Sequence, residues 1–383
     1  MVSSADAYRW QSGKTAPAPL SAASLVEGRA LRNSLYMPLL VPALEDLLTL
    51  GVAVERVEAV FKRSLSELRQ PLVYVPLLMS RRFWELAVAA SGDPGIGLEL
   101  GRGLLSRLPN NLTYLFDVAP SLAEGFGYFV DFLPGFYGHF EAEVLLGEDE
   151  VQVRLHDRGS LKASPAVLDY LLSGICSLVR RKVVALGLRD SPLRRVSLAH
   201  AAPAGPARHA AAWQLPVSWG QAFHALHFDR ALFLRPLSPG NEGMIATLLA
   251  LTGQIRQNNH PTLLVQVCDH ISTHLSGDSS LESFCLQHHM TKRTVTRRLL
   301  AQGWRYSELL DAFRSYRAAD LLRDPAQALV DTAEQLGYRD LPSFSRAFTR
   351  WYGRSPGAWR EAELGGGLAS LRGKSLHKLV PTD

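Results

Sequence analysis

The hexapeptide Thr294-Val295-Thr296-Arg297-Arg298-Leu299 recurs 49 residues later as Ser343-Phe344-Ser345-Arg346-Ala347-Phe348. Both copies read small hydroxyl, apolar, small hydroxyl, arginine, variable, apolar. Because the two apolar residues of each copy are four positions apart, they share one face of a helix, and the arginine lies on the opposite face. Each copy is therefore predicted to be an amphipathic helix that presents an arginine to solvent.

A short apolar stripe and a turn precede each of these helices. The stripes are Leu281, Phe284 and Cys285 in the first copy and Leu329, Thr332, Ala333 and Leu336 in the second, and the turns are residues 288–290 and 337–340. A helix, a short turn and a second helix make a helix-turn-helix, whose second helix enters the major groove of DNA. A helix over 306–323, roughly 27 Å long at 1.5 Å per residue, would separate the two modules by about one DNA turn.

The positive charge of the chain gathers in the same segment. Residues 281–360 contain 13 Lys and Arg against 8 Asp and Glu, whereas the remainder contains 28 of each sign. A basic surplus confined to the helix-turn-helix segment favours binding to the phosphate backbone of a nucleic acid.

Length and composition narrow the class of protein. The 383 residues are 47% apolar and 20% charged, which is typical of two or three globular domains. No apolar run has the length of a membrane span, and residues 1–20 lack the apolar core of a secretory signal, so we expect a cytoplasmic protein. Three widely spaced cysteines indicate neither a disulfide framework nor a zinc site. No metal, cofactor or catalytic motif is predicted.

The apolar spacing predicts an α+β N-terminal domain, with a helical subdomain and a small β-sheet, followed by an all-α double helix-turn-helix domain. The expected helices of the first part are 38–50, 57–65, 76–91, 97–107, 121–136 and 164–186, with strands at 140–146, 151–156, 193–199, 216–219 and 225–228 around an Ala-rich helical piece. The helices expected after it are 241–257, 262–275, 281–288, 292–302, 306–323, 326–336 and 341–352.

This C-terminal segment resembles the AraC/XylS family of bacterial transcription regulators. The resemblance rests on Gly337-Tyr338, Phe344-Ser345-Arg346-Ala347-Phe348, Gly353, Ser355-Pro356-Gly357-Ala358-Trp359-Arg360 and, in the first module, Leu281, Met290-Thr291, Arg297-Arg298-Leu299 and Gly303. The N-terminal part is similar to a regulatory domain of about 190 residues found in one branch of the family, through residues 91–98, 226–228 and 234–237. The resemblance implies activation of nearby genes through RNA polymerase, although repression by occlusion uses the same fold.

The sequence departs from the family pattern at two positions of the second module. Thr332 stands where a branched aliphatic residue is usual, and Pro342 stands where members often carry a polar residue that contacts bases. Because proline has no side-chain donor, we expect the second module to read fewer bases than the first.

Together these observations divide the chain into five parts. Residues 1–25 are expected to form a flexible leader, 26–238 an effector-binding and dimerisation domain, 239–261 a helical linker, 262–360 the DNA-binding domain and 361–383 a flexible tail. The predicted partners are promoter DNA, a small-molecule effector, RNA polymerase and a second copy of the chain in a homodimer. Which effector, which operator, the sign of regulation and whether the dimer needs the effector stay open.

The residues expected to contact DNA lie on the exposed faces of the two repeated helices. Base edges are assigned to Arg293, Thr296, Arg297, Ser343, Ser345 and Arg346, and phosphate to Arg350, with Arg298 and Arg354 on the flanks. The alternative interpretation is that these arginines are simply exposed to solvent and contact no DNA. His288 and His289 are interpreted as turn residues, His224 and His227 as strand residues, and Cys285 as part of the core, rather than as metal ligands.

The effector site is expected near an aromatic stretch. Residues 114–140 contain nine of the 33 aromatic residues and no Lys or Arg. Ligand pockets are mostly apolar with a few placed polar groups, and the polar groups assigned here are Tyr114, Tyr128, Asp131, Tyr137 and His139. The alternative is a plain aromatic core. At the level of the whole chain, the alternatives are a non-specific nucleoid-type DNA binder and a small-molecule enzyme with an appended DNA-binding domain.

Overall fold

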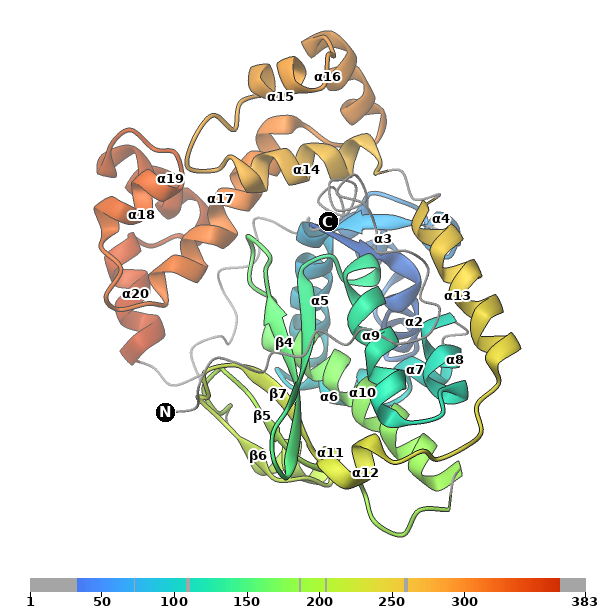
Figure 1. Ribbon diagram of the computed structural model, residues 1–383. Helices are drawn as coiled ribbons and strands as arrows, with labels where there is room; N and C mark the ends of the chain where they lie inside the picture. The colour runs from blue at the N-terminus through green and yellow to red at the C-terminus, as the bar shows by residue number, and fades with distance from the viewer. Residues whose placement is uncertain are drawn as a thin grey trace.

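The computed structural model describes residues 33–71, 73–107, 111–185, 187–203, 205–257 and 261–365. Residues 33–257 form an α+β part that holds the predicted effector-binding domain and the helix of the predicted linker, and residues 261–365 form an all-helical part that holds the predicted DNA-binding domain (Figure 1). We call these parts the sensor and the DNA-binding half. The predicted leader, residues 258–260 of the predicted linker and residues 366–383 of the predicted tail lie outside the described ranges. Within those ranges no helix has the length and apolar character that crossing a bilayer requires.

A five-stranded sheet forms one layer of the sensor. Its order is β3-β4-β7-β5-β6, and every pairing is antiparallel except that of β5 with β6. The predicted hairpin is confirmed, with Phe140 opposite Asp157. Strand alternation places Val153 and Leu226 opposite one another on the buried face. The strands are β3 (Phe140–Leu146), β4 (Glu150–Asp157), β5 (Leu193–Ser197), β6 (Val217–Ser218) and β7 (His224–Asp229).

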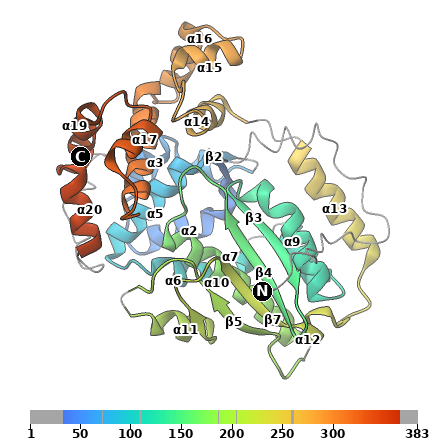
Figure 2. The same ribbon diagram turned by 60° about the vertical axis from the view of Figure 1, so that its left-hand side comes forward.

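Two helices of the sensor determine how its core packs. Helix α9 (Leu122–Phe136) lies beside β3 (Figure 2) and places the Phe126 ring 5.1 Å from that of Phe228. Helix α10 (Pro165–Ala185) crosses α6 (Ile96–Arg102) so closely that a Cβ on Gly97 would lie 2.1 Å from the carbonyl oxygen of Ala166. Only glycine fits at this crossing.

The remaining sensor elements include several that the sequence did not predict. The missed elements are the antiparallel ribbon of β1 (Ser34–Tyr36) and β2 (Tyr74–Pro76), helix α8 (Asn111–Val118) and helix α12 (Arg230–Leu234). The helix expected over 57–65 is instead two helices, because Lys62 adopts a left-handed φ of 50° and Ser64 caps the second one. The other elements are η1 (Met37–Leu39), α2 (Val41–Thr49), α3 (Val54–Phe61), α4 (Leu65–Leu68), α5 (Leu77–Ser91), α7 (Leu104–Arg107), α11 (Ala207–Trp213) and α13 (Glu242–Gln257).

The DNA-binding half contains every helix that the sequence predicted there. Side-chain oxygens of Thr262, Ser280, Thr291 and Asp340 accept backbone N–H groups at four of the helix starts. The helix expected from 326 begins at Leu329. The elements are α14 (Leu263–Thr273), α15 (Leu281–Gln287), α16 (Lys292–Ala301), α17 (Tyr306–Leu322), α18 (Leu329–Gln335), α19 (Leu341–Tyr352) and α20 (Pro356–Gly365).

Candidate nucleic-acid interface

Helix α16 presents a row of arginines. Val295 and Leu299 are buried against the rest of the first module, which turns the opposite face of the helix outward. The side chains on that face are exposed, and none of the arginines among them pairs with an acidic group in the part of the chain that the structure describes. They are Arg293, Thr296, Arg297 and Arg298.

Helix α19 has the same two faces, but its arginines have partners. Phe344 and Phe348 are fully buried, and Arg346 is exposed. The Arg346 guanidinium donates to Ser343 Oγ at 3.0 Å, and Arg350 pairs with Asp311 of α17 at 2.8 Å. Ser343 and Ser345 are half-buried, and Pro342 occupies the first turn of the helix.

The turns of both modules require special backbone conformations. Gly337 has a φ of +74°, and a Cβ there would lie 2.6 Å from the carbonyl oxygen of Leu275, so glycine is required. His289 has a φ of 51° in the first turn. No group of three or more metal-ligating side chains occurs among the described residues, and Cys285 is buried.

Helix α17 holds the two modules together, as Figure 1 shows. The Tyr352 hydroxyl donates to the carbonyl oxygen of Ser315 at 3.0 Å, and Arg314 donates to the carbonyl oxygen of Leu336 at 2.9 Å. The side chains of Leu309, Phe313 and Tyr316 are buried. At its other end, the Tyr306 hydroxyl donates to the carbonyl oxygen of Ser279 at 3.0 Å, so α17 joins the first module to the second.

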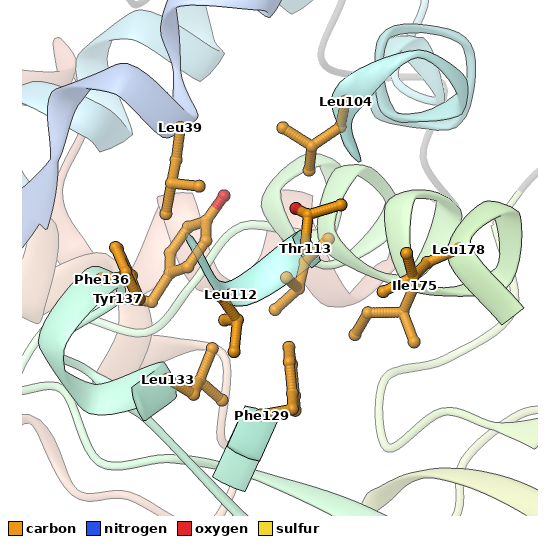
Figure 3. Close-up of a pocket in the computed structure, with 11 residues that line it drawn as sticks. Leu39, Leu104, Leu112, Thr113, Phe129, Leu133, Phe136, Tyr137, Ile175 and Leu178 are labelled. Carbon is orange, nitrogen blue, oxygen red and sulfur yellow. The ribbon is translucent and has the colours of Figure 1, made fainter. Parts of the chain in front are cut away.

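In the sensor, a small cavity lies among α9, α8 and α10 (Figure 3). Two of its eleven lining residues, Thr113 and Tyr137, carry a polar side-chain atom, and none is charged. Burial raises the pKa of Tyr137 above its usual value, so the phenol stays neutral. The apolar lining residues are Leu39, Leu104, Leu112, Phe129, Leu133, Phe136, Leu171, Ile175 and Leu178.

The five residues predicted at the effector site do not share one cavity, although the rings of Tyr137 and His139 lie 6.2 Å apart. Tyr137 lines the cavity, whereas Tyr114 on α8 is 48% exposed. On α9, Tyr128 is half-buried and Asp131 is exposed. His139 is buried outside the cavity lining, where burial lowers its pKa to about 3. Of the five predicted residues, Tyr137 is the one among the lining residues of this cavity, which lies beside the aromatic stretch.

Comparison with known protein families accounts for both halves. A model of the arabinose-binding domain of AraC transcription regulators matches residues 51–237, and a helix-turn-helix domain model matches residues 285–362. The chain belongs to the AraC family of transcriptional regulators. It is accordingly a sequence-specific helix-turn-helix DNA-binding regulator of a non-enzymatic family.

Individual relatives share one or both halves. The ornithine utilization regulator of Pseudomonas aeruginosa is 25% identical over 294 residues, which cover 72% of this chain and 81% of that protein. The transcriptional activator RhaR of Pectobacterium atrosepticum is 36% identical over 84 residues, covering 22% of this chain and 30% of that protein. The crystal structure of the regulator CdpR from Pseudomonas aeruginosa aligns with 81% of this chain and 96% of its own at 22% identity and a TM-score of 0.36.

Proposed function

We propose that this AraC-family regulator activates transcription in the cytoplasm by binding promoter DNA with both modules and contacting RNA polymerase. The observation that carries this proposal is the pair of exposed arginine faces, on α16 and α19, fixed on the common spacer α17. The relative RhaR is named a transcriptional activator, which supports activation rather than repression by this chain.

The proposed DNA contacts are of two kinds, contacts to base edges and contacts to phosphate. Arginine pairs bidentately with guanine, whereas contacts to phosphate add affinity without sequence preference. We assign base edges to the exposed residues Arg293, Thr296, Arg297 and Arg346, with Ser343 and Ser345 beside them. Arg350 is assigned to phosphate.

A homodimer completes the proposal. One double module covers about two turns of DNA, and its charge surplus of +5 is modest, so a monomer would bind weakly at physiological salt. Pairing through the sensor raises the effective concentration of the second module. Light scattering should find a dimer in the presence of operator DNA and effector, and a monomer under all conditions would contradict this part.

The effector is proposed to be a small, largely apolar molecule that widens the cavity of Figure 3, because the free space there, about 30 Å³, has room for little more than one water molecule. A sugar would leave its hydroxyl groups unpaired against a lining of hydrocarbon side chains, and each unpaired group costs binding energy. We therefore expect uncharged aromatic or short alkyl compounds, rather than arabinose, to stabilise the sensor.

The proposal is tested on the full chain. Fragments of genomic DNA that the protein selects define its operator, and transcription from such a fragment with purified RNA polymerase should rise when the regulator is added. In a thermal-shift series, an apolar compound should raise the melting temperature and alter operator affinity. Ile175→Phe, which fills the cavity, should abolish that response. Stabilisation by arabinose that survives Ile175→Phe would contradict the assignment of the cavity.

A further inference from the structure

Long side chains of α5 reach α17 and join the sensor to the DNA-binding half. Arg81 donates to both carboxylate oxygens of Asp320, at 2.9 and 2.8 Å. The backbone N–H of Lys162 donates to the same carboxylate at 3.2 Å. The two paired side chains are only 11% and 6% exposed, so this ion pair belongs to the interior of the molecule.

A second bond lies one helical turn away on each helix. The Tyr316 hydroxyl donates to Glu85 Oε2 at 2.5 Å, and the Arg81 guanidinium lies 4.7 Å from the centre of the Tyr316 ring. Because Arg81 and Glu85 are four apart, as are Tyr316 and Asp320, each pair projects from one face of its helix. The two helices therefore present matched faces to each other. We call these four side chains the clamp.

Two further contacts join the sensor to the first module. Lys62 donates to the carbonyl oxygen of Gly303 at 2.5 Å and lies 4.1 Å from the centre of the Trp304 ring, directly after α16. At the ribbon, Asn33 donates to Asp269 of α14 at 2.7 Å, and α14 packs on β2. Buried apolar side chains of both halves form one continuous cluster.

The contact with the sensor leaves the recognition side chains open. Arg293, Thr296, Arg297 and Arg346 are exposed while the clamp is closed. The same contact covers the side of α17 that carries Tyr316 and Asp320, whose side chains are buried in it. The closed arrangement thus combines free recognition faces with a fixed spacer.

We propose that Arg81 and Glu85 are positioning residues for DNA binding, and that the closed clamp is the DNA-binding form. The sensor, through the clamp, holds α17 and hence both recognition helices in one orientation. This inference rests on the proposed function. It adds that residues of the sensor, far from the recognition helices, determine operator affinity.

The cavity is adjacent to both points of contact. Tyr170 donates to the carbonyl oxygen of Leu39, which lines the cavity, at 2.8 Å, and its ring lies 5.0 Å from that of Trp84 on α5. On the other side, the ring of Phe136, also a lining residue, lies 5.4 Å from that of Tyr36 in the ribbon. An effector that displaces these walls would act on α5 through Tyr170 and on the ribbon through Phe136.

The test reverses one charge in the clamp of the full chain. In Arg81→Glu a second carboxylate faces Asp320, which should open the clamp. Arg102→Glu is the control, because it makes the same change of charge in an exposed pair with Glu99 on α6. We expect Arg81→Glu to increase the radius of gyration in small-angle scattering and to weaken binding to the selected operator at least tenfold. Arg102→Glu should stay within twofold of the wild type.

A second, milder variant tests whether the effect of Arg81→Glu reflects misfolding of the chain. Asp320→Asn keeps the shape of the side chain but removes its charge, and we expect it to weaken operator binding less than Arg81→Glu does, with a normal circular dichroism spectrum. The inference is overturned if Arg81→Glu leaves the radius of gyration unchanged, or if either variant binds the operator as tightly as the wild type or more tightly.

These outcomes are distinct from failure of the proposed function. If the wild-type chain selects no operator at all, the DNA-binding role fails before the clamp is tested. If the wild type and Arg102→Glu bind the operator and the clamp variants bind equally well, only the positioning role fails. Arg297→Ala further separates loss of a DNA contact from loss of positioning, because it should weaken operator binding with no change in the radius of gyration.

Discussion

The two helix-turn-helix modules share a backbone plan but differ in what their recognition helices have available for DNA. In the first, Arg293, Arg297 and Arg298 of α16 face solvent with no acidic partner among the described residues. In the second, Arg346 is bonded to Ser343 and Arg350 to Asp311. If Arg346 and Arg350 contact DNA, they must first exchange these bonds, whereas the three arginines of α16 need not; the paired basic residue of α16 is Lys292, which contacts Glu282.

The modules also differ in their connection to the sensor. Lys62 and Asn33 contact the first module directly, at Gly303 and Asp269. For the second module, the hydrogen bonds described above reach α17, at Tyr316 and Asp320. We therefore propose a division of labour, in which the first module reads most of the operator sequence and the second mainly adds affinity.

The sharpest test of this division removes one arginine from each module. Arg297→Ala should weaken operator binding roughly 10- to 100-fold, since a good arginine–guanine pair discriminates by about 1 to 3 kcal/mol, and should also reduce the ratio of operator to random-DNA affinity. Arg346→Ala should do the same to a smaller degree, because its bond to Ser343 has to be exchanged first. Fluorescence anisotropy measures the affinity of each variant and of the wild type for operator DNA and for random DNA. An equal or larger effect of Arg346→Ala would reverse the proposed division.

Acid should destabilise the first module more than the second. His270 is buried, and burial lowers its pKa below the ordinary value of about 6.5. Its Nδ1 bonds Gln287 Oε1 at 3.0 Å, whereas its buried Nε2 has no hydrogen-bond partner among the described residues. The folded state therefore favours the neutral ring, so this contribution to stability is present above pH 6.5 and is lost as the pH falls below it.

Amide hydrogen exchange measures this difference region by region. Between pH 7 and 5.5 the protection factors of α15 and α16 should fall more than those of α18 and α19, a segment that contains no histidine. His270→Gln should reduce the difference, whereas the control His289→Gln, at an exposed position, should leave it unchanged. An equal loss of protection in both modules would show that His270 is not responsible.

The sequence predicted the modules far better than it predicted their attachment. The helices of 262–360 follow from local signals, namely four-residue apolar spacing and caps such as Thr291 and Asp340. The clamp joins residues that are 239 positions apart, Arg81 and Asp320, and no local pattern marks such a pair.

The sensor was predicted in its class but not in all its parts. Strands β1 and β2 are three residues each, too short for alternation to identify, and the left-handed backbone at Lys62 has no sequence cue of the kind that glycine supplies. The aromatic stretch predicted the neighbourhood of the cavity. The lining also needs Leu171, Ile175 and Leu178 of α10, which only the tertiary fold brings there.

A smaller effect is expected from Arg350→Ala in the second module. Arg350 and Asp311 are 62% and 43% exposed, and exposed pairs contribute little to stability. The substitution should weaken operator and random DNA by a similar factor of about two to five, as expected for the loss of one phosphate contact. The salt dependence of binding should fall by about one unit of slope. A selective loss of operator binding would instead place Arg350 at a base edge.

The smallest effect concerns Thr332, the departure from the family pattern in the core of the second module. Thr332 is fully buried, and its hydroxyl donates to the carbonyl oxygen of Ala328 at 2.9 Å. That carbonyl also accepts the backbone N–H of Thr332 at 3.0 Å, so it keeps a partner when the hydroxyl is removed. Thr332→Val preserves the branched shape and buries a methyl group in place of the hydroxyl. It should raise the free energy of unfolding by up to about 1 kcal/mol.

Thr332→Ser is the matched control for this substitution, because it keeps the hydroxyl and deletes the methyl group. It should lower the free energy of unfolding by about 1 kcal/mol, the cost of one buried methyl and the space it leaves. Urea denaturation of the full chain, followed through the exchange protection of α18 and α19, measures both changes. If Val destabilises the module more than Ser does, the hydroxyl rather than the methyl group is what this core position requires, and the departure from the family pattern is a gain in stability for this chain.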